Sequence, residues 1–229
     1  MQAVRIYHNI EILYEDNHLL VINKPPCMLS QGDKTGNQDV QSILKKYLKE
    51  KYQKPGNVFL ALVQRLDRPV RGLMVLARTS KAASRLSDQI RRRTMQKGYL
   101  AVVEGNSVTE GEIVHYLKKN ETIKKTEVSQ PKTPGAQKAV LDISSLKVMG
   151  KRTIVRITLH TGRFHQIRAQ LAASGTPVSG DQKYGAKPLP DKSIALQCHS
   201  LAFGHPVSKE IMKFNADIPS GFPWNQFAL

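Results

Sequence analysis

The chain has 229 residues and the composition of a folded globular protein, with a strong excess of positive charge. Hydrophobic residues make up 40% of the sequence and charged residues 23%, which excludes a disordered or collagen-like chain. The 35 Lys and Arg residues against 18 Asp and Glu leave a net charge of +17. Such an excess indicates a polyanionic partner, and nucleic acid is favoured over a membrane surface.

Cysteine usage and hydropathy favour a cytoplasmic protein. Cys27 and Cys198 lack a Cys-x-x-Cys spacing, which excludes a disulfide framework and a four-cysteine zinc site. No His-Glu-x-x-His motif occurs either, so we expect no metal. No apolar run approaches the roughly 18 residues that cross a bilayer, and the amino terminus lacks a signal-peptide core. We therefore expect no membrane association.

The amino-terminal part of the chain predicts a hairpin and a helix. Two short apolar runs, at 10–14 and 19–22, flank the turn-forming segment 15–18. Apolar side chains at helical spacing then predict an amphipathic helix over 40–52, with lysines on its opposite face.

The next elements are a strand and a second helix. The unbroken apolar run 73–77 predicts a strand that is covered on both faces. Thr79 or Ser80 is placed to cap a helix that follows, and the basic residues from Arg91 to Arg93 fall at its carbonyl end.

The second half of the chain is predicted to contain two strands, an exposed loop and a helix. The apolar run 99–103 fits the interior of a sheet, whereas the lysine-rich segment 105–138 is typical of an exposed loop. Alternating residues predict a strand over 153–160, and a helical stripe starts at Phe164 and stops at Gly175.

Strands interrupted by a few helices at irregular spacing predict an α+β fold. No shift in composition marks a domain boundary. We therefore expect a single catalytic or binding domain over 1–229.

A carboxylate between two guanidinium groups is the strongest candidate for chemistry. Asp67 lies in Arg65-Leu66-Asp67-Arg68, just before the predicted buried strand. On local sequence alone, a surface ion pair is the favoured explanation of this aspartate. Arg168 adjoins the apolar stripe of the last predicted helix, so its partly desolvated head needs an anionic partner, and Asp67 is a candidate.

Four ordered motifs resemble those of the RluA-type pseudouridine synthases, a family of rRNA and tRNA uridine isomerases. Together they span about 180 residues. The motifs are Asn23-Lys24-Pro25-Pro26; Arg65 to Arg68 with Gly72-Leu73 and Ala77-Arg78-Thr79; Lys97-Gly98-Tyr99 to Gly105; and Thr161-Gly162-Arg163 to Arg168 with Gly175, Gly180-Asp181 and Tyr184-Gly185. Leu196 and His205-Pro206 fit the last block of the family.

The resemblance implies a mixed, mainly antiparallel sheet flanked by helices, with a central active-site cleft. It implies an enzyme that needs no cofactor and has no separate amino-terminal S4 domain. The site residues that it implies are Asp67 as the catalytic aspartate, Tyr99 beside the base, Arg168 as the partner of the aspartate, Arg65 as the residue that helps to expel the base, and Lys24 and Leu196 at the substrate.

The sequence departs from the family pattern beside the proposed catalytic residue. Gln64 stands where the family usually has His, Val70-Arg71 where it has Thr-Ser, and Phe164 where it has Thr. These departures keep open an alternative, a catalytically silent RNA-binding or ribosome-assembly relative of the same fold.

Clustered basic residues predict contacts to RNA phosphates. Arg91, Arg92, Arg93 and Lys97 are the candidates, in a chain that we expect to act as a monomer on rRNA or tRNA. Because a uridine must leave its stack to react, an unpaired uridine in structured RNA is the expected target.

Overall fold

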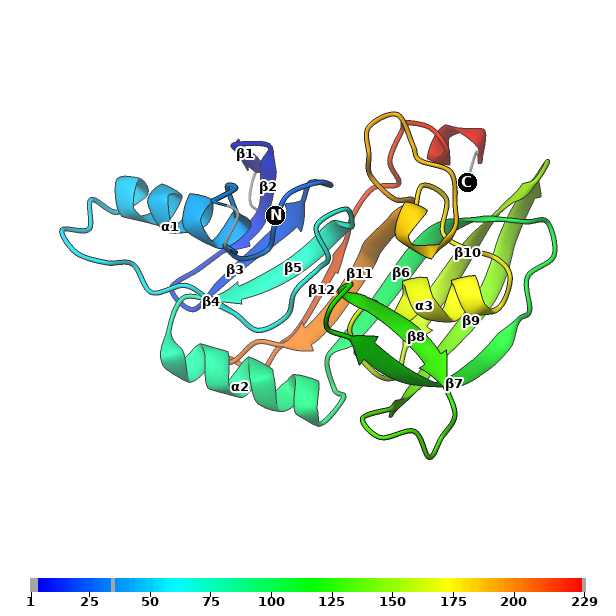
Figure 1. The fold of residues 1–229 in the computed structure, drawn as a ribbon. Coiled ribbons are helices and arrows are strands. Elements are labelled where there is room, and N and C mark those ends of the chain that lie inside the picture. The colour runs from blue at the N-terminus through cyan, green and yellow to red at the C-terminus, as the bar shows by residue number, and fades with distance from the viewer. Residues whose placement is uncertain (1–3, 34–35, 228–229) are drawn as a thin grey trace. The chain divides into compact units, whose positions relative to one another are not determined.

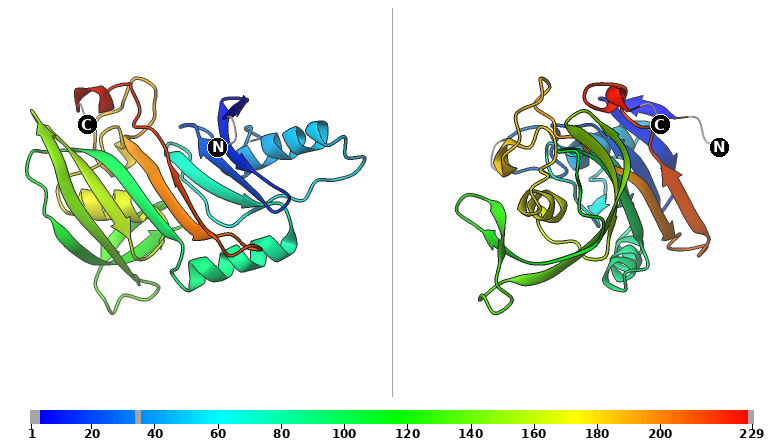
Figure 2. Two further views of the ribbon diagram at one scale, coloured as in Figure 1. Left: turned by 180° about the vertical axis from the view of Figure 1, so that it is seen from behind. Right: turned by 90° about the vertical axis from the view of Figure 1, so that its right-hand side faces the viewer.

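The structure, a computed structural model, describes residues 4–33 and 36–227, which form two compact units. The first unit is built from the described residues up to Gln96 together with Cys198–Ala216. The second is built from Lys97–Gln197 together with the described residues from Asp217 onward. Each unit carries its own antiparallel strands (Figures 1 and 2).

The strands of the first unit are arranged in the order β1-β2-β3-β5-β11, with β12 paired to β11 and β4 paired to β5 (Figure 1). The registered pairings β1/β2, β2/β3, β3/β5, β4/β5 and β11/β12 are all antiparallel. The bounds are β1 Arg5–Tyr7, β2 Ile10–Glu15, β3 Leu19–Lys24, β4 Ala61–Leu62, β5 Arg71–Ala77, β11 Leu196–Gly204 and β12 Ile211–Asn215. The predicted hairpin is confirmed as β2 and β3, and the predicted buried strand as β5.

Two helices belong to the first unit, and both start where a side chain caps them. Helix α1 (Val40–Lys51) begins after Asp39, whose carboxylate accepts from the Ser42 N–H. Helix α2 (Ser80–Arg91) begins after Thr79, whose hydroxyl accepts from the Ala82 N–H. Both predicted helices are confirmed.

The strands of the second unit are arranged in the order β6-β10-β9-β7-β8, with antiparallel pairing throughout the registered ladders. A small core of Leu117, Ala139, Ala169 and Tyr184 joins its strands to a helix. The bounds are β6 Gln96–Glu104, β7 Gly111–Asn120, β8 Lys125–Ser129, β9 Gln137–Met149, β10 Arg152–Leu159, α3 Gln166–Ala173, η1 Gln182–Tyr184 and η2 Trp224–Gln226.

The prediction of an exposed loop over 105–138 was wrong, because β7 and β8 form a hairpin there. Along β7, Ile113 and Leu117 are buried, whereas Glu112, Val114, Lys118 and Lys119 are exposed. On β8 only Thr126 is buried. The charged outer face masked the alternation of these short strands.

The start of the last predicted helix was also wrong: the apolar stripe was predicted to begin at Phe164, whereas α3 begins at Gln166. Phe164 lies before α3 and is 39% exposed. The backbone of His165 is left-handed, with φ of 52°, so the chain turns between Phe164 and the first helical residue. Otherwise the predicted α+β fold with a mainly antiparallel sheet is confirmed.

Candidate active site

Asp67 lies in a short irregular segment between β4 and β5 of the first unit. The Ser30 hydroxyl accepts from the Leu66 N–H at 3.1 Å and donates to the Leu66 carbonyl at 2.7 Å. The Val70 N–H donates to the Asp67 carbonyl at 3.0 Å and closes a turn. Ser30 and Leu66 are buried, and Asp67 is half-buried. The carboxylate is therefore carried on a firmly held backbone and remains accessible.

Lys24 at the end of β3 holds the same segment from the other side. It is fully buried, and its ammonium donates to the carbonyls of Pro25 at 3.0 Å, Met28 at 2.7 Å and Arg68 at 3.2 Å. An ammonium has three N–H donors, and these three acceptors match them. The Arg68 contact ties β3 to the turn that follows Asp67. A contact between Lys24 and substrate stays a prediction.

The charges around Lys24 are coupled to Asp67. Burial lowers the pKa of Lys24 to about 7, while Cys27 and Asp67 act to raise it and Arg71 acts to lower it. A negative charge on Asp67 thus favours the charged form of the lysine that anchors its own segment.

Two side chains before Asp67 differ in environment. Arg65 is exposed. Gln64 is half-buried, and its Nε2 is buried without a hydrogen-bond partner among the residues that the structure describes. A buried N–H donor of this kind lowers the stability of the fold unless a solvent molecule or a ligand accepts a hydrogen bond from it.

Tyr99 and Leu196 lie in the second unit. Tyr99 is near the start of β6, opposite Ile157 of β10, and is 7% exposed. Leu196 begins β11 and is 3% exposed. Both side chains are therefore held by packing.

Arg168 on α3 is a buried cation with an identified partner. Its guanidinium donates to the two carboxylate oxygens of Asp181, from Nε at 2.7 Å and from Nη2 at 2.9 Å. The Tyr184 ring lies 5.1 Å from the guanidinium carbon. The expected desolvation of Arg168 and its need for an anion are thus confirmed, with Asp181 as one partner that local sequence reasoning missed.

Tyr184 links this pair to the β7/β8 hairpin. Its hydroxyl accepts from the Thr126 N–H at 2.9 Å and lies 3.0 Å from His165 Nδ1. The Thr126 hydroxyl in turn donates to the Phe164 carbonyl at 2.7 Å. Gly180-Asp181 and Tyr184-Gly185 both stand in the last matched motif, which is the signal by which these positions could have been found.

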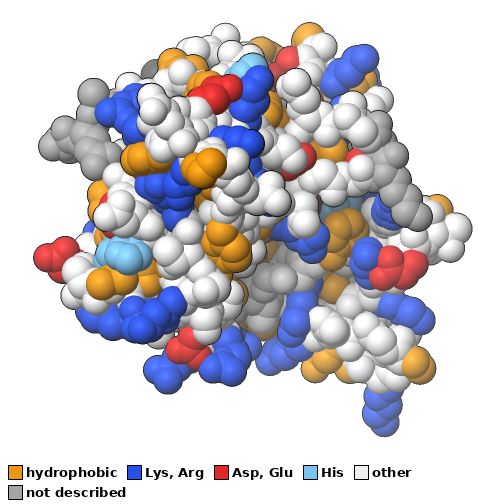
Figure 3. All heavy atoms as spheres, turned by 90° about the vertical axis from the view of Figure 1, so that its left-hand side faces the viewer, with side chains coloured by type: hydrophobic (Ala, Val, Ile, Leu, Met, Phe, Trp, Pro, Cys, Tyr) orange, Lys and Arg blue, Asp and Glu red, His pale blue; other side chains and the backbone are white. Residues whose placement is uncertain are grey.

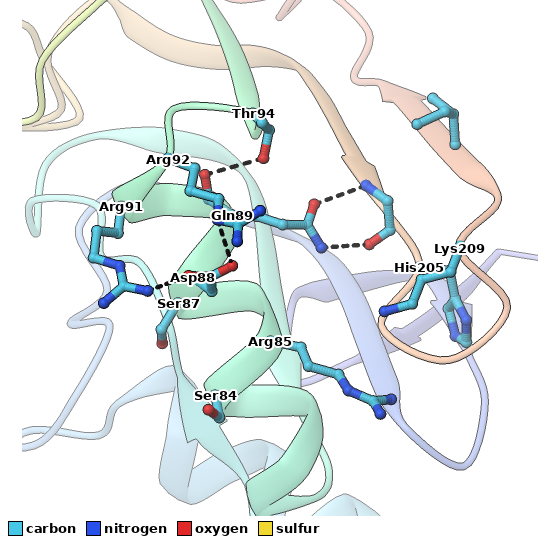
Figure 4. Close-up of a pocket in the computed structure, with 12 residues that line it drawn as sticks. Ser84, Arg85, Ser87, Asp88, Gln89, Arg91, Arg92, Thr94, His205 and Lys209 are labelled. Atoms are coloured by element: carbon cyan, nitrogen blue, oxygen red, sulfur yellow. Dashed lines mark hydrogen bonds and ion pairs between the residues drawn. The ribbon is translucent and has the colours of Figure 1, made fainter.

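Basic side chains are widespread on the face drawn in Figure 3, and carboxylates are few there. Arg91, Arg92 and Arg93 are exposed at the carbonyl end of α2, and Lys97 is half-buried in β6. Arg91 and Arg92 both pair with Asp88 (Figure 4). These positions are available for contacts to phosphates.

The six predicted site residues fall into two sets. Lys24, Arg65 and Asp67 belong to the first unit, whereas Tyr99, Arg168 and Leu196 belong to the second. Within the first set the structure shows Lys24 bonded to the segment that carries Asp67.

Within residues 4–33 and 36–227, no three His, Cys, Asp or Glu side chains are grouped so that they could hold a metal ion. No helix in the described part of the chain is long and apolar enough to span a bilayer.

Comparison with known sequences identifies the relatives of this chain. The family model described as RNA pseudouridylate synthase matches residues 18–173. An uncharacterised RNA pseudouridine synthase of Bacillus subtilis, YjbO, is 32% identical over 212 residues, which cover 92% of this chain and 73% of the relative. Ribosomal large subunit pseudouridine synthase D of Salmonella typhimurium is 34% identical over 227 residues, covering 92% and 67%.

Solved structures share the fold. Human RNA pseudouridylate synthase domain containing 4 superposes with a TM-score of 0.75 at 22% identity, over 91% of this chain and 88% of that one. Human RNA pseudouridylate synthase domain containing 1 gives a TM-score of 0.69 at 22% identity, over 95% and 86%. The family model matches residues 18–173, and the two bacterial relatives are 32% and 34% identical to this chain. The chain therefore belongs to the RNA pseudouridylate synthase family.

Proposed function

We propose that this protein isomerises uridine to pseudouridine in structured RNA, with Asp67 as the catalytic carboxylate. The observation that carries the proposal is the Arg65–Arg68 motif, held between Ser30 and Lys24 in a chain of this family. A fixed backbone and an accessible carboxylate suit a group that must reach a reacting ribose.

The reaction is an isomerisation, so its atoms and electrons balance within the substrate. The N1–C1′ bond of uridine breaks, the uracil turns, and a C5–C1′ bond forms. The C5 hydrogen leaves as a proton, and N1 gains one. Asp67 either adds to C1′ or removes the C2′ proton to give a glycal, and neither route consumes a cofactor.

Four other residues complete the proposed site. Arg168 pairs with the Asp67 carboxylate and keeps it ionised, in addition to the bond that it makes to Asp181. Tyr99 lies against the uracil and assists the proton transfer at C5. Arg65 helps to expel the uridine from its stack, and Leu196 supports the base.

Large-subunit rRNA is the first substrate to test, because relatives are named ribosomal large subunit pseudouridine synthases. tRNA is the second. We propose that the protein works as a monomer in the cytoplasm, with its two units acting as one catalytic domain. Phosphates would be bound by Arg91, Arg92, Arg93 and Lys97.

Tritium release from RNA labelled at uridine C5 tests the proposal, because C5 loses its hydrogen only when it becomes the glycosidic carbon. Purified protein should release tritium from host rRNA or tRNA. We expect Asp67→Asn to abolish release while RNA binding persists, since the amide keeps the shape but loses the charge and nucleophilicity.

The matched control is Asp217→Asn, which removes one carboxylate from an exposed position outside the Asp67 segment and should leave the rate unchanged. Folded Asp67→Asn protein that released tritium at the parental rate would show that Asp67 is structural. A parent protein that bound RNA without releasing tritium would establish the silent relative instead. The departures at Gln64, Val70 and Arg71 favour that alternative.

A further inference from the structure

A groove of about 790 Å³ lies between α2 and the turn that joins β11 to β12, wholly within the first unit (Figure 4). Four of its lining side chains are cations and one is a carboxylate. The cations are Arg85, Arg91, Arg92 and Lys209, and the carboxylate is Asp88. The groove therefore carries an excess of positive charge.

The two walls of the groove are fixed to each other. Gln89 Nε2 donates to the Gly204 carbonyl at 2.7 Å, and its Oε1 accepts from the Gly204 N–H at 2.8 Å. On the turn, the His205 ring lies 2.8 Å from Asp16, and its Nδ1 accepts from the Ser208 N–H at 3.0 Å. A ligand would thus meet donors that are already in place.

Two of the cations converge on one acceptor. Arg85 Nη1 donates to the Pro206 carbonyl at 2.7 Å, and Lys209 Nζ donates to the same oxygen at 3.3 Å. Two positive groups on one neutral oxygen repel each other, and an anion placed between them would remove this repulsion.

The other two cations project from the helix. The side chains of Arg91 and Arg92 are 80% and 71% exposed, and both contact Asp88. One carboxylate is shared by two guanidinium groups, so positive charge remains on this wall. Arg85, Arg91 and Arg92 extend from α2 and Lys209 extends from the turn, so both walls of the groove carry cations (Figure 4).

We propose that this groove binds the phosphodiester backbone of RNA, next to the segment that enters the active site. The inference rests on the proposed function, and it adds Arg85 and Lys209 to the RNA surface. An open groove with cations on both walls matches a chain of regularly spaced anions. Since the donors face phosphates, they position the RNA without reading its sequence.

The test is equilibrium binding of a hairpin RNA with unpaired loop uridines, measured over a range of salt concentrations. The variant Arg85→Gln with Lys209→Gln removes the convergent pair, and each Gln retains an N–H donor for Pro206. The matched control, Lys46→Gln with Lys49→Gln, removes the same charge from exposed positions on α1. Thermal unfolding of each variant verifies folding.

We expect the groove variant to bind on the order of ten- to a hundredfold more weakly near 0.1 M salt, with a log-log salt slope shallower by about 1.5, because two phosphate contacts are lost. The α1 control should bind like the parent. Hairpins of different loop sequence should lose affinity by the same factor.

A second variant, Arg92→Glu with Lys209→Glu, leaves the Arg85 bond intact and keeps the test decisive if the first variant unfolds. Parental affinity and an unchanged salt slope in a folded groove variant would overturn the proposal. A groove that binds an acidic protein segment instead of RNA would give this same result. Tritium release is read separately. If the groove variant binds RNA more weakly but the parent protein releases no tritium, the groove proposal is supported and the proposed isomerase activity is refuted.

Discussion

Asp181 and Arg168 form a buried ion pair in the second unit, joined by two hydrogen bonds of 2.7 and 2.9 Å. The side chains are 1% and 6% exposed, so neither charge is compensated by bulk water. Asp181 fixes the plane of the guanidinium that the proposed mechanism sets beside the catalytic carboxylate. Asp181 therefore holds the Arg168 side chain in place.

Asp181→Asn should lower the free energy of unfolding by about 3–5 kcal/mol, because it removes the negative charge that accepts two hydrogen bonds from a buried guanidinium. The exposed pair Lys119–Glu121 offers a control in the same unit. Glu121→Gln should change stability by less than about 1 kcal/mol. Urea unfolding measures both. Equal effects of the two substitutions would show that the Asp181 carboxylate is paired no more strongly than a surface charge.

Lys24 should make stability depend on pH above neutrality. Its pKa is about 7 in the folded protein against an ordinary value of 10.5, so between these values the unfolded chain holds a proton that the folded protein lacks. The Lys24 contribution to stability therefore rises with pH across this window, by up to about 1.4 kcal/mol per unit. Below pH 7 both states are charged, and this dependence ends.

The measurement is urea unfolding of the parent and Lys24→Met at several pH values within that window. The variant lacks the titrating amine, so the difference in unfolding free energy between the two proteins isolates the lysine. We expect that difference to grow with pH. A constant difference would mean that the three backbone carbonyls keep Lys24 protonated throughout.

Gly72 should tolerate no side chain. Its φ is +122°, and a Cβ there would lie 2.4 Å from the Cys198 carbonyl oxygen and 2.5 Å from the Cys198 nitrogen. Gly72→Ala should cost more than about 3 kcal/mol, because the backbones of β5 and β11 must separate. Gly56→Ala meets no atom within 4 Å and should change stability by less than about 0.5 kcal/mol. Similar unfolding midpoints for the two variants would contradict this account.

Periodicity predicted the elements that have one buried face and a clear cap. Helix α1 follows its apolar spacing, and α2 starts at the predicted Thr79 cap. The β7/β8 hairpin was missed because only Ile113, Leu117 and Thr126 are buried along its two strands, so its alternation of buried and exposed residues is weak. The misplacement of Phe164 has another cause, the left-handed backbone of His165, which apolar spacing does not encode.

The sequence nominates candidate site residues but not the groups that hold them in place. The matched motifs single out Asp67 and Arg168, whereas the bonds of Ser30 to Leu66 join positions far apart in the chain. Nothing in the local pattern around Ser30 distinguishes it from any other loop serine. Lys24 stands in a matched motif, but its three acceptors are backbone carbonyls, so residue types do not reveal which groups it binds.

Gln64 offers a test of whether a departure from the family pattern serves the reaction. Its amide nitrogen is buried without a protein partner among the described residues, whereas the Gln41 amide donates to the Leu60 carbonyl at 2.7 Å. Gln64→Met should therefore stabilise the free protein by about 1 kcal/mol, and Gln41→Met should destabilise it by a similar amount. Both changes keep side-chain volume, so their opposite signs in urea unfolding isolate the hydrogen bond.

Catalysis should respond to Gln64 in the opposite direction. If a group of the bound RNA accepts a hydrogen bond from the Gln64 amide, Gln64→Met should lower kcat/KM for tritium release about tenfold. Gln41→Met should leave kcat/KM within about twofold of the parent. Gln64→Met that destabilised the free protein as Gln41→Met does would show that the amide already has a partner without RNA. Unchanged turnover in a stabilised Gln64→Met variant would show that the departure from His at this position is neutral for the reaction, and that the unmatched donor is simply a cost to the fold.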